Sequence, residues 1–222
     1  MPCVSVIESW DLAVFRWINR DWAGPAVDPW MHFLSGNRYF IPALAALGVG
    51  LLWRGGRRGR VFVVTLALVA AFANGLVADP MKRIIRRPRP YAVVSDVVLR
   101  VGKGNPLGSM PSAHAMNCAL MAAVAGWYYR RSLWLAAPVA FGVAWSRVYN
   151  GAHFPSDVLA GAGLGAGSAG LGLYVSERAW RWLGPRFAPA WVLVMPSWTR
   201  PEWDAAKPAS TAAHGPSDGA RG

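Results

Sequence analysis

The chain has 222 residues, of which 54% are hydrophobic and 15% are charged, and its formal net charge is +12. Soluble globular domains carry about 25% charged residues, so this composition argues against a soluble domain. The positive charge suits either nucleic acid or an anionic membrane surface, and the long apolar runs favour the membrane. We therefore expect a protein of the lipid bilayer with no nucleic-acid partner.

The first 37 residues are predicted to lie on the membrane surface. Asp11–Ser35 mixes aromatic and aliphatic side chains with charged ones, among them Arg16, Arg20, Asp21 and Asp28. A charge near the bilayer centre costs about 2.5–3.5 kcal/mol on insertion scales. The pattern therefore favours an N-terminal interfacial region, built as an amphipathic helix and a turn. A sixth membrane span in this region is the alternative.

Five apolar stretches predict a bundle of membrane-spanning helices. They are Tyr39–Trp53, Val61–Ala78, Ala113–Tyr129, Leu133–Val148 and Val158–Val175. Their lengths lie near the lower limit of about 17–25 residues for a spanning helix. Turn or charge signals separate them, and Asp79-Pro80 is interpreted as the end of the second. The fold class is therefore all-α, a polytopic membrane bundle of five or six spans over residues 38–178.

The remaining segments have distinct compositions. Gly161, Gly165 and other glycines recur through the last apolar stretch, which predicts close packing against a neighbouring helix. Residues 179–198 combine tryptophans with arginines and prolines, as is typical of an interfacial segment. Residues 199–222 are rich in Pro, Ala, Ser and Gly and are predicted to be a disordered tail.

The first of three polar motifs is basic. Lys82 and Arg89-Pro90 follow the second apolar stretch. Lysine supplies a mobile point charge, whereas arginine supplies a planar fork that matches phosphate oxygens. The alternative is that these cations only contact lipid headgroups.

The second motif, Pro111-Ser112-Ala113-His114, opens the third apolar stretch. Ser112 is a suitable N-cap, and the amides at a helix start carry partial positive charge and bind phosphate readily. His114, two residues further on, can protonate a leaving alkoxide. The alternatives are that Ser112 only caps the helix and that His114 is structural.

The third motif is Ser146-Arg147 followed by His153 and Asp157, around the turn between the last two apolar stretches. A carboxylate four residues after a histidine can accept a hydrogen bond from one imidazole nitrogen, which leaves the other free to attack. The alternatives are a snorkelling Arg147 and an Asp157 that only begins a helix.

Because successive spanning helices alternate in direction, the three motifs are expected on one face of the membrane. Together they suit holding a phosphate, attacking its phosphorus and protonating its leaving group. The opposite loops carry Arg54, Arg57, Arg58, Arg60, Arg130 and Arg131, but the long loop on the side of the motifs carries seven basic residues, so charge counting alone does not decide the orientation. If part of this second set binds an anion, the first set marks the cytoplasmic side. We therefore expect an extracytoplasmic site in the cell membrane.

These motifs resemble those of the type 2 phosphatidic acid phosphatase (PAP2) superfamily. That pattern is Lys, six residues, Arg-Pro; then Pro-Ser-Gly-His; then Ser-Arg, five residues, His, three residues, Asp. The match covers Lys82–Asp157, about a third of the chain, with Ala113 in place of the glycine. The extra methyl group narrows the space beside the phosphate.

The resemblance implies a lipid phosphatase that works without a metal ion or another cofactor, through a phosphohistidine. His153 would be the nucleophile, oriented by Asp157, with His114 as general acid. The phosphate would be held by Lys82, Arg89, Ser112, Ala113 and Arg147.

The expected partner is a membrane lipid phosphate, with undecaprenyl (polyprenyl) diphosphate as the first choice and lipid A, phosphatidylglycerophosphate or phosphatidate as alternatives. Two other classes stay open: a vanadium-dependent haloperoxidase, and a non-catalytic lipid-phosphate binding or transport protein. The sequence does not indicate an oligomeric state.

Overall fold

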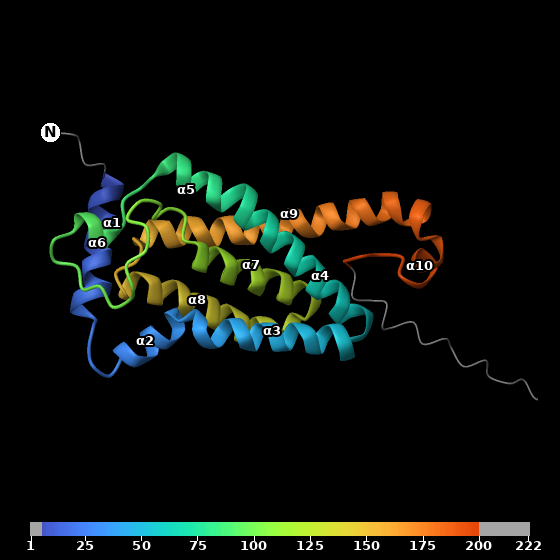
Figure 1. Ribbon diagram of the computed structural model, residues 1–222, viewed down its shortest axis with the longest axis horizontal. Coiled ribbons are helices and arrows are strands. Elements are labelled where there is room, and N and C mark those ends of the chain that lie inside the picture. Colours follow the sequence, from blue (N-terminus) through green and yellow to red (C-terminus); the bar gives the residue numbers. More distant parts are fainter. Residues whose placement is uncertain (1–5, 200–222) are drawn as a thin grey trace, which may run out of the picture.

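The computed structural model describes residues 6–199, and within this range every regular element is a helix. The all-α class is therefore confirmed for the described residues, and the tail beyond Thr199 lies outside them. Five long helical passages run between the two ends of an elongated bundle (Figure 1). They are α3 (Asn37–Arg54), α4 (Gly56–Phe72) with its continuation, α7 (Ala113–Tyr128), α8 (Leu133–Tyr149) and α9 (Pro155–Phe187).

Two of these passages are long and apolar enough to cross a membrane. They are Gly56–Ile85 and Pro155–Phe187, whose apolar 18-residue windows have mean hydropathies of 2.4 and 1.5. Phe40–Arg54 within α3 is apolar but shorter. The structure thus supports a membrane helical fold, whereas the number of spans stays a prediction.

The second passage is longer than the sequence indicated. α4 continues through the π-helical segment η2 (Ala73–Ala78) into α5 (Asp79–Ile85), so the prediction that Asp79-Pro80 ends this helix is wrong. Pro80 lies at the junction of η2 and α5, where the π-helical segment interrupts the regular hydrogen-bond ladder of the helix. The helix ends instead at Arg86, whose φ of 46° is left-handed. As a result, Lys82 is carried on a helix turn.

Helix α9 also continues, 12 residues beyond the predicted end of its span at Val175. After it, α10 (Pro189–Val194) and the residues up to Thr199 fold back toward the bundle (Figure 1). Glu177 on α9 fixes this segment, because its carboxylate accepts hydrogen bonds from the hydroxyl of Ser197 at 2.8 Å and the amide of Thr199 at 3.0 Å.

Helices α7 and α9 pack backbone against backbone. A Cβ atom at Gly161 would lie 2.4 Å from the carbonyl oxygen of Ser112, and one at Gly165 would lie 2.1 Å from that of Met116. Neither distance is compatible with a side chain, so the predicted close packing of this glycine-rich helix is confirmed. The amide of Ser112 also donates to the carbonyl of Asp157 at 3.0 Å, which joins the starts of the two helices.

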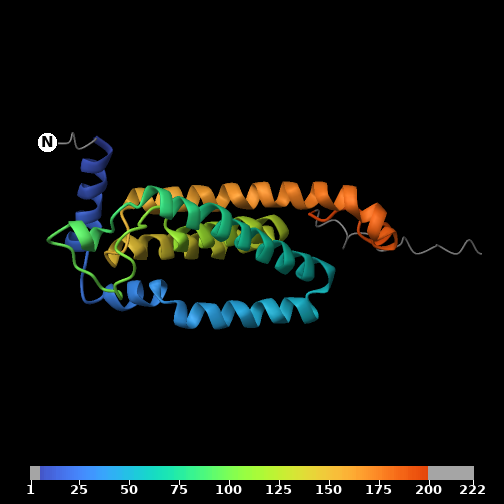
Figure 2. The same ribbon diagram turned by 45° about the horizontal axis from the view of Figure 1, so that its top comes forward.

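The N-terminal region consists of short pieces at one end of the bundle. They are α1 (Val6–Arg16), η1 (Trp17–Asp21) and α2 (Asp28–Ser35), and α1 lies across that end (Figure 2). None of the three pieces is long enough to cross a bilayer. Asn19 of η1 anchors the region, because its amide donates to the carbonyls of Val98 and Tyr149.

Candidate active site

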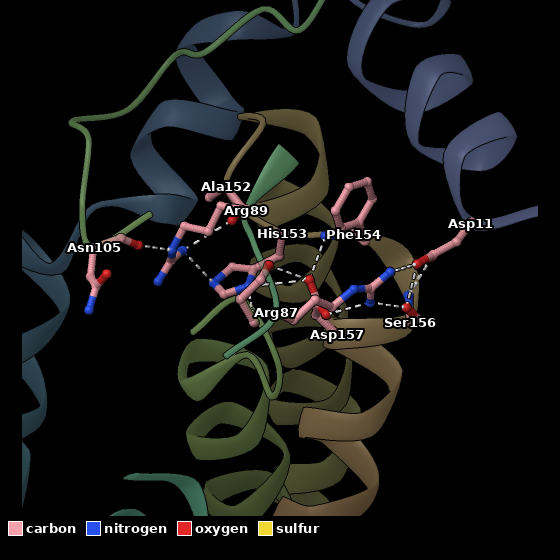
Figure 3. A network of polar contacts seen from close by, with 10 residues as sticks. Asp11, Arg87, Arg89, Asn105, Ala152, His153, Phe154, Ser156 and Asp157 are labelled. Atoms are coloured by element: carbon pink, nitrogen blue, oxygen red, sulfur yellow. Dashed lines mark hydrogen bonds and ion pairs between the residues drawn. The ribbon is translucent and has the colours of Figure 1, made fainter. Parts of the chain in front are cut away.

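The loop between α5 and α7 folds back on itself and positions Arg89. The amide of Arg89 donates to the carbonyl of Pro106 at 2.9 Å, and the guanidinium donates to the carbonyls of Asn105 and Ala152 at 2.9 and 3.0 Å. Gly108 has a φ of +98°, which allows the second half of the loop to turn beside Lys82. These contacts place Arg89 Nη1 3.1 Å from Nε2 of His153 (Figure 3).

His153 is buried, and both of its ring nitrogens have partners. Nδ1 lies 2.7 Å from the carbonyl oxygen of Ser109. Since a carbonyl only accepts, this contact assigns the proton to Nδ1 and leaves the lone pair on Nε2. Nε2 therefore faces Arg89 as an acceptor, on the side where a phosphate would bind.

Asp157 lies behind His153 but makes a longer contact than the sequence suggested. Its Oδ2 is 3.8 Å from Nδ1 of the imidazole, beyond hydrogen-bond length. The same oxygen accepts from the hydroxyl of Ser109 at 2.5 Å and from the amide of Phe154 at 2.8 Å. The carbonyl of Ser109 thus takes the hydrogen bond that we expected Asp157 to accept, while the carboxylate remains close enough to stabilise a charged ring.

The surroundings of His153 favour its neutral form. Burial lowers the pKa of His153, and the nearby positive charges of Arg89 and Arg147 lower it further. Asp157 acts in the opposite direction but does not outweigh these effects. A neutral imidazole is the form that can attack phosphorus.

The second predicted histidine, His114, lies among the predicted cations of the site. His114, on the first turn of α7, interacts electrostatically with Arg147, His153, Lys82 and Arg89. Arg147 is only 9% exposed, and its Nη1 donates to the hydroxyl of Ser35. Its buried Nε has no hydrogen-bond partner, and none of the described carboxylates forms an ion pair with it.

Ser112 occupies the N-cap position of α7, as predicted, but its hydroxyl does not cap the helix. The side chain is fully buried, and its Oγ has no partner among the described residues. Ala113 is the first residue of the helix and is half-buried. An unpartnered hydroxyl beside helix-start amides is an arrangement that can bind an anion.

The sequence did not reveal four residues of this site: Asp11, Ser35, Arg87 and Ser109. Arg87 lies inside the basic stretch that ends with Arg89, so it could not be told from its neighbours. Asp11 and Ser35 come from the N-terminal region, far away in sequence. The only available signal was that a carboxylate in an apolar segment needs a partner when buried.

A metal ion would need several ligands in one place. Within residues 6–199, no group of three His, Cys, Asp or Glu side chains lies close enough together to hold one.

Comparisons with known proteins identify the family of this chain. The sequence profile described as PAP2 superfamily matches residues 60–181, more than half of the chain. The decaprenylphosphoryl-5-phosphoribose phosphatase of Mycobacterium tuberculosis is 37% identical over 112 residues, covering 50% of this chain and 58% of the relative. The lipid A 4'-phosphatase of Bacteroides thetaiotaomicron is 27% identical over 166 residues, covering 69% and 72%.

A solved structure has the same arrangement of helices. The crystal structure of LpxE from Aquifex aeolicus superposes with a TM-score of 0.60 at 25% identity, covering 73% of this chain and 94% of that one.

Proposed function

Because the chain belongs to the PAP2 superfamily of phosphate ester hydrolases, we propose that it hydrolyses the diphosphate of a polyprenyl lipid, undecaprenyl diphosphate, through a phosphohistidine and without a metal ion. The reaction would take place where the polar end of the bundle meets the membrane surface.

The group of cations around the two histidines carries this proposal. Lys82, Arg89 and Arg147 interact electrostatically with His114. A buried charge left without a partner destabilises a protein by about 3–5 kcal/mol. An incoming phosphate would supply the missing negative charge to Arg147 and an acceptor for the hydroxyl of Ser112.

The proposed reaction has two steps. Nε2 of His153 attacks the terminal phosphorus, a P–N bond forms, and the P–O bond to the leaving group breaks as His114 donates a proton to that oxygen. His114 then removes a proton from water, which attacks the phosphohistidine, releases inorganic phosphate and regenerates His153. The cations hold the equatorial oxygens, and this stabilisation of charge is usually the largest contribution to catalysis.

The proposed polyprenyl substrate is supported by one relative, whereas another relative supports a different lipid. The 37% identical relative is named for a decaprenyl-linked phosphate, which favours a polyprenyl substrate. The 27% identical relative is named for lipid A, so lipid A is the main alternative. Phosphatidylglycerophosphate and phosphatidate remain in the same chemical class.

We also propose that all five long passages cross the membrane and that the site lies on the extracytoplasmic face. The alternation of the helices and the arginines at the α3–α4 and α7–α8 turns support this orientation. It can be tested by replacing both native cysteines with alanine and labelling a new cysteine in intact cells. We expect an impermeant reagent to label Gly104→Cys but not Arg131→Cys, both of which are exposed positions.

The activity itself is tested by measuring phosphate release from the purified protein with undecaprenyl diphosphate, lipid A, phosphatidylglycerophosphate and phosphatidate. We expect the highest kcat/KM with the polyprenyl lipid, full activity in EDTA, and inhibition by vanadate, which mimics pentacoordinate phosphorus. A higher kcat/KM with another lipid of this panel would make that lipid the substrate in place of undecaprenyl diphosphate. Lipid binding without any phosphate release would indicate a binding or transport protein.

A further inference from the structure

Arg87 connects two buried carboxylates at the polar end of the bundle. Its Nη1 donates to Oδ1 of Asp157 at 2.7 Å, and its Nη2 donates to Oδ2 of Asp11 at 2.6 Å. Nη1 also lies 2.6 Å from the hydroxyl of Ser156, and the guanidinium stacks 4.6 Å from the ring of Phe154. Figure 3 shows Arg87 between the two carboxylates, with His153 on the far side of Asp157.

Asp11 brings the N-terminal helix into this network. It lies on α1, which crosses the end of the bundle, and its side chain is 1% exposed. Besides Arg87, its carboxylate accepts hydrogen bonds from the hydroxyl and the amide of Ser156, the latter at 2.8 Å. Helix α1 is therefore bonded directly to the turn of α9 that carries Asp157.

The charges of this network hold it together. Burial lowers the pKa of Arg87, but the hydrogen bonds and charges of Asp11 and Asp157 outweigh burial and raise it overall. Arg87 is therefore a permanent cation between two carboxylates. Unlike Arg147, it already pairs with two carboxylates.

We propose that Arg87 and Asp11 are positioning residues of the catalytic site, so that docking of α1 sets the geometry of the nucleophile. Arg87 binds Oδ1 of Asp157, while the other oxygen, Oδ2, accepts hydrogen bonds from Ser109 and Phe154 and lies 3.8 Å from Nδ1 of His153. Without Arg87, Asp157 loses the partner of Oδ1, one of the three contacts that hold its carboxylate in place. The inference rests on the proposed phosphatase activity, because the geometry concerned is that of His153.

The test compares kcat and KM for three variants, Arg87→Lys, Asp11→Asn and the double variant. Lysine keeps the charge but cannot bridge two carboxylates as a planar fork does. Because small misplacements of reacting groups can cost about 10²-fold in rate, we expect kcat to fall about 100-fold in Arg87→Lys and about 10-fold in Asp11→Asn. KM should stay within about twofold, since neither residue touches the substrate.

The double variant and a matched control make the test specific. Residues that act through one network are not additive, so the double variant should lose no more kcat than Arg87→Lys alone. Asp96→Asn is the control, because Asp96 pairs with Arg16 and Arg20 of the same N-terminal region but belongs to no contact of this network. Its kcat should stay within about twofold of wild type.

Each other result overturns the inference. A raised KM with unchanged kcat would make Arg87 a substrate-binding residue, and equal losses in Asp96→Asn and Asp11→Asn would indicate a general role of α1. If the wild type is active and kcat is unchanged in both single variants, Arg87 and Asp11 have no positioning role, and the proposed phosphatase activity is unaffected. A wild type without turnover would overturn both. If Arg87→Lys does not fold, Asp11→Asn, which keeps the shape of the side chain, decides the question.

Discussion

The two ends of the helical bundle use arginine in different ways. At the end opposite the histidines, two arginines bind acceptors of the chain itself: Arg181 pairs with Glu177 at 2.6 Å, and Arg60 donates to the carbonyl of Leu52 at 3.0 Å. At the histidine end, Arg147 is nearly buried, has no described carboxylate beside it, and keeps an unpartnered Nε. Composition alone does not separate the two, because both ends are basic.

The difference shows that the candidate active site is marked by a cation with unpartnered hydrogen-bond donors, and not by positive charge alone. An exposed ion pair contributes about 0–1 kcal/mol, so the arginines at the far end can be replaced with little effect. A buried guanidinium without a counterion lowers the stability of the protein. Such a residue is expected where a ligand supplies the counterion. The following experiments test this contrast.

The largest effect is expected from His153→Ala. Removing the proposed nucleophile should abolish phosphate release, because among the described imidazoles only that of His153 lies within hydrogen-bond distance of Arg89. The control is His32→Ala, which changes an exposed histidine on α2 and should leave turnover at the wild-type level. Normal turnover in His153→Ala would refute the role of this residue.

Replacing Arg147 by alanine should lower kcat about 10²–10³-fold, the usual effect of removing one group that stabilises transition-state charge. Arg181→Ala at the other end is the matched comparison, since this arginine is 55% exposed and paired with Glu177. We expect it to behave as wild type. Similar kcat values for the two variants would remove the contrast between the ends.

Gly161→Ala tests whether the site depends on the contact between α7 and α9. The added methyl would lie 2.4 Å from the carbonyl oxygen of Ser112, and relieving such a clash typically costs about 1–3 kcal/mol. We expect a lower melting temperature together with reduced kcat. Gly163→Ala is the control, because nothing lies within 4 Å of its Cβ position. A melting temperature of Gly161→Ala equal to that of the control would contradict the packing.

Ser112→Ala should separate binding of the phosphate from folding. A hydrogen bond to a charged group contributes about 1.5–3 kcal/mol, so we expect a roughly 10- to 100-fold loss in kcat/KM. Stability should stay unchanged, because the hydroxyl caps nothing in the free protein. A loss of stability without a change in kcat/KM would assign Ser112 a structural role.

The pH dependence gives the smallest effect. Since burial and the neighbouring arginines lower the pKa of His153 below its ordinary value of about 6.5, the neutral nucleophile should persist as the pH falls through 6.5. The acid limb of the kcat/KM profile should therefore lie below that pH. An acid limb above pH 7 would indicate a raised pKa and contradict the surroundings described for His153.

The sequence was sufficient for the motifs and for their meeting at one end. Lys82, Arg89, His114, Arg147 and His153 were all identified from spacing and from the alternation of helix direction, and the structure brings them together. Their chemical roles stay predictions.

What the sequence did not reveal depends on tertiary contacts. The hydrogen bond from His153 to the carbonyl of Ser109 involves a main-chain atom, which any residue type would supply. The Asp11–Arg87 pair joins residues that are 76 positions apart. The passage of the helix through Asp79-Pro80 was missed because proline usually ends a helix, and the preceding π-helical segment has no clear sequence signature.

The length of α9 has a mechanical consequence. Its 33 residues form a rod of about 50 Å, whereas the hydrocarbon layer of a bilayer measures about 30 Å. With Asp157 in its first turn at one headgroup layer, its last turns would project beyond the other. Any force that slides this rod along the membrane normal would then shift the nucleophile relative to the plane of lipid phosphates, so bilayer thickness becomes a variable that can tune turnover.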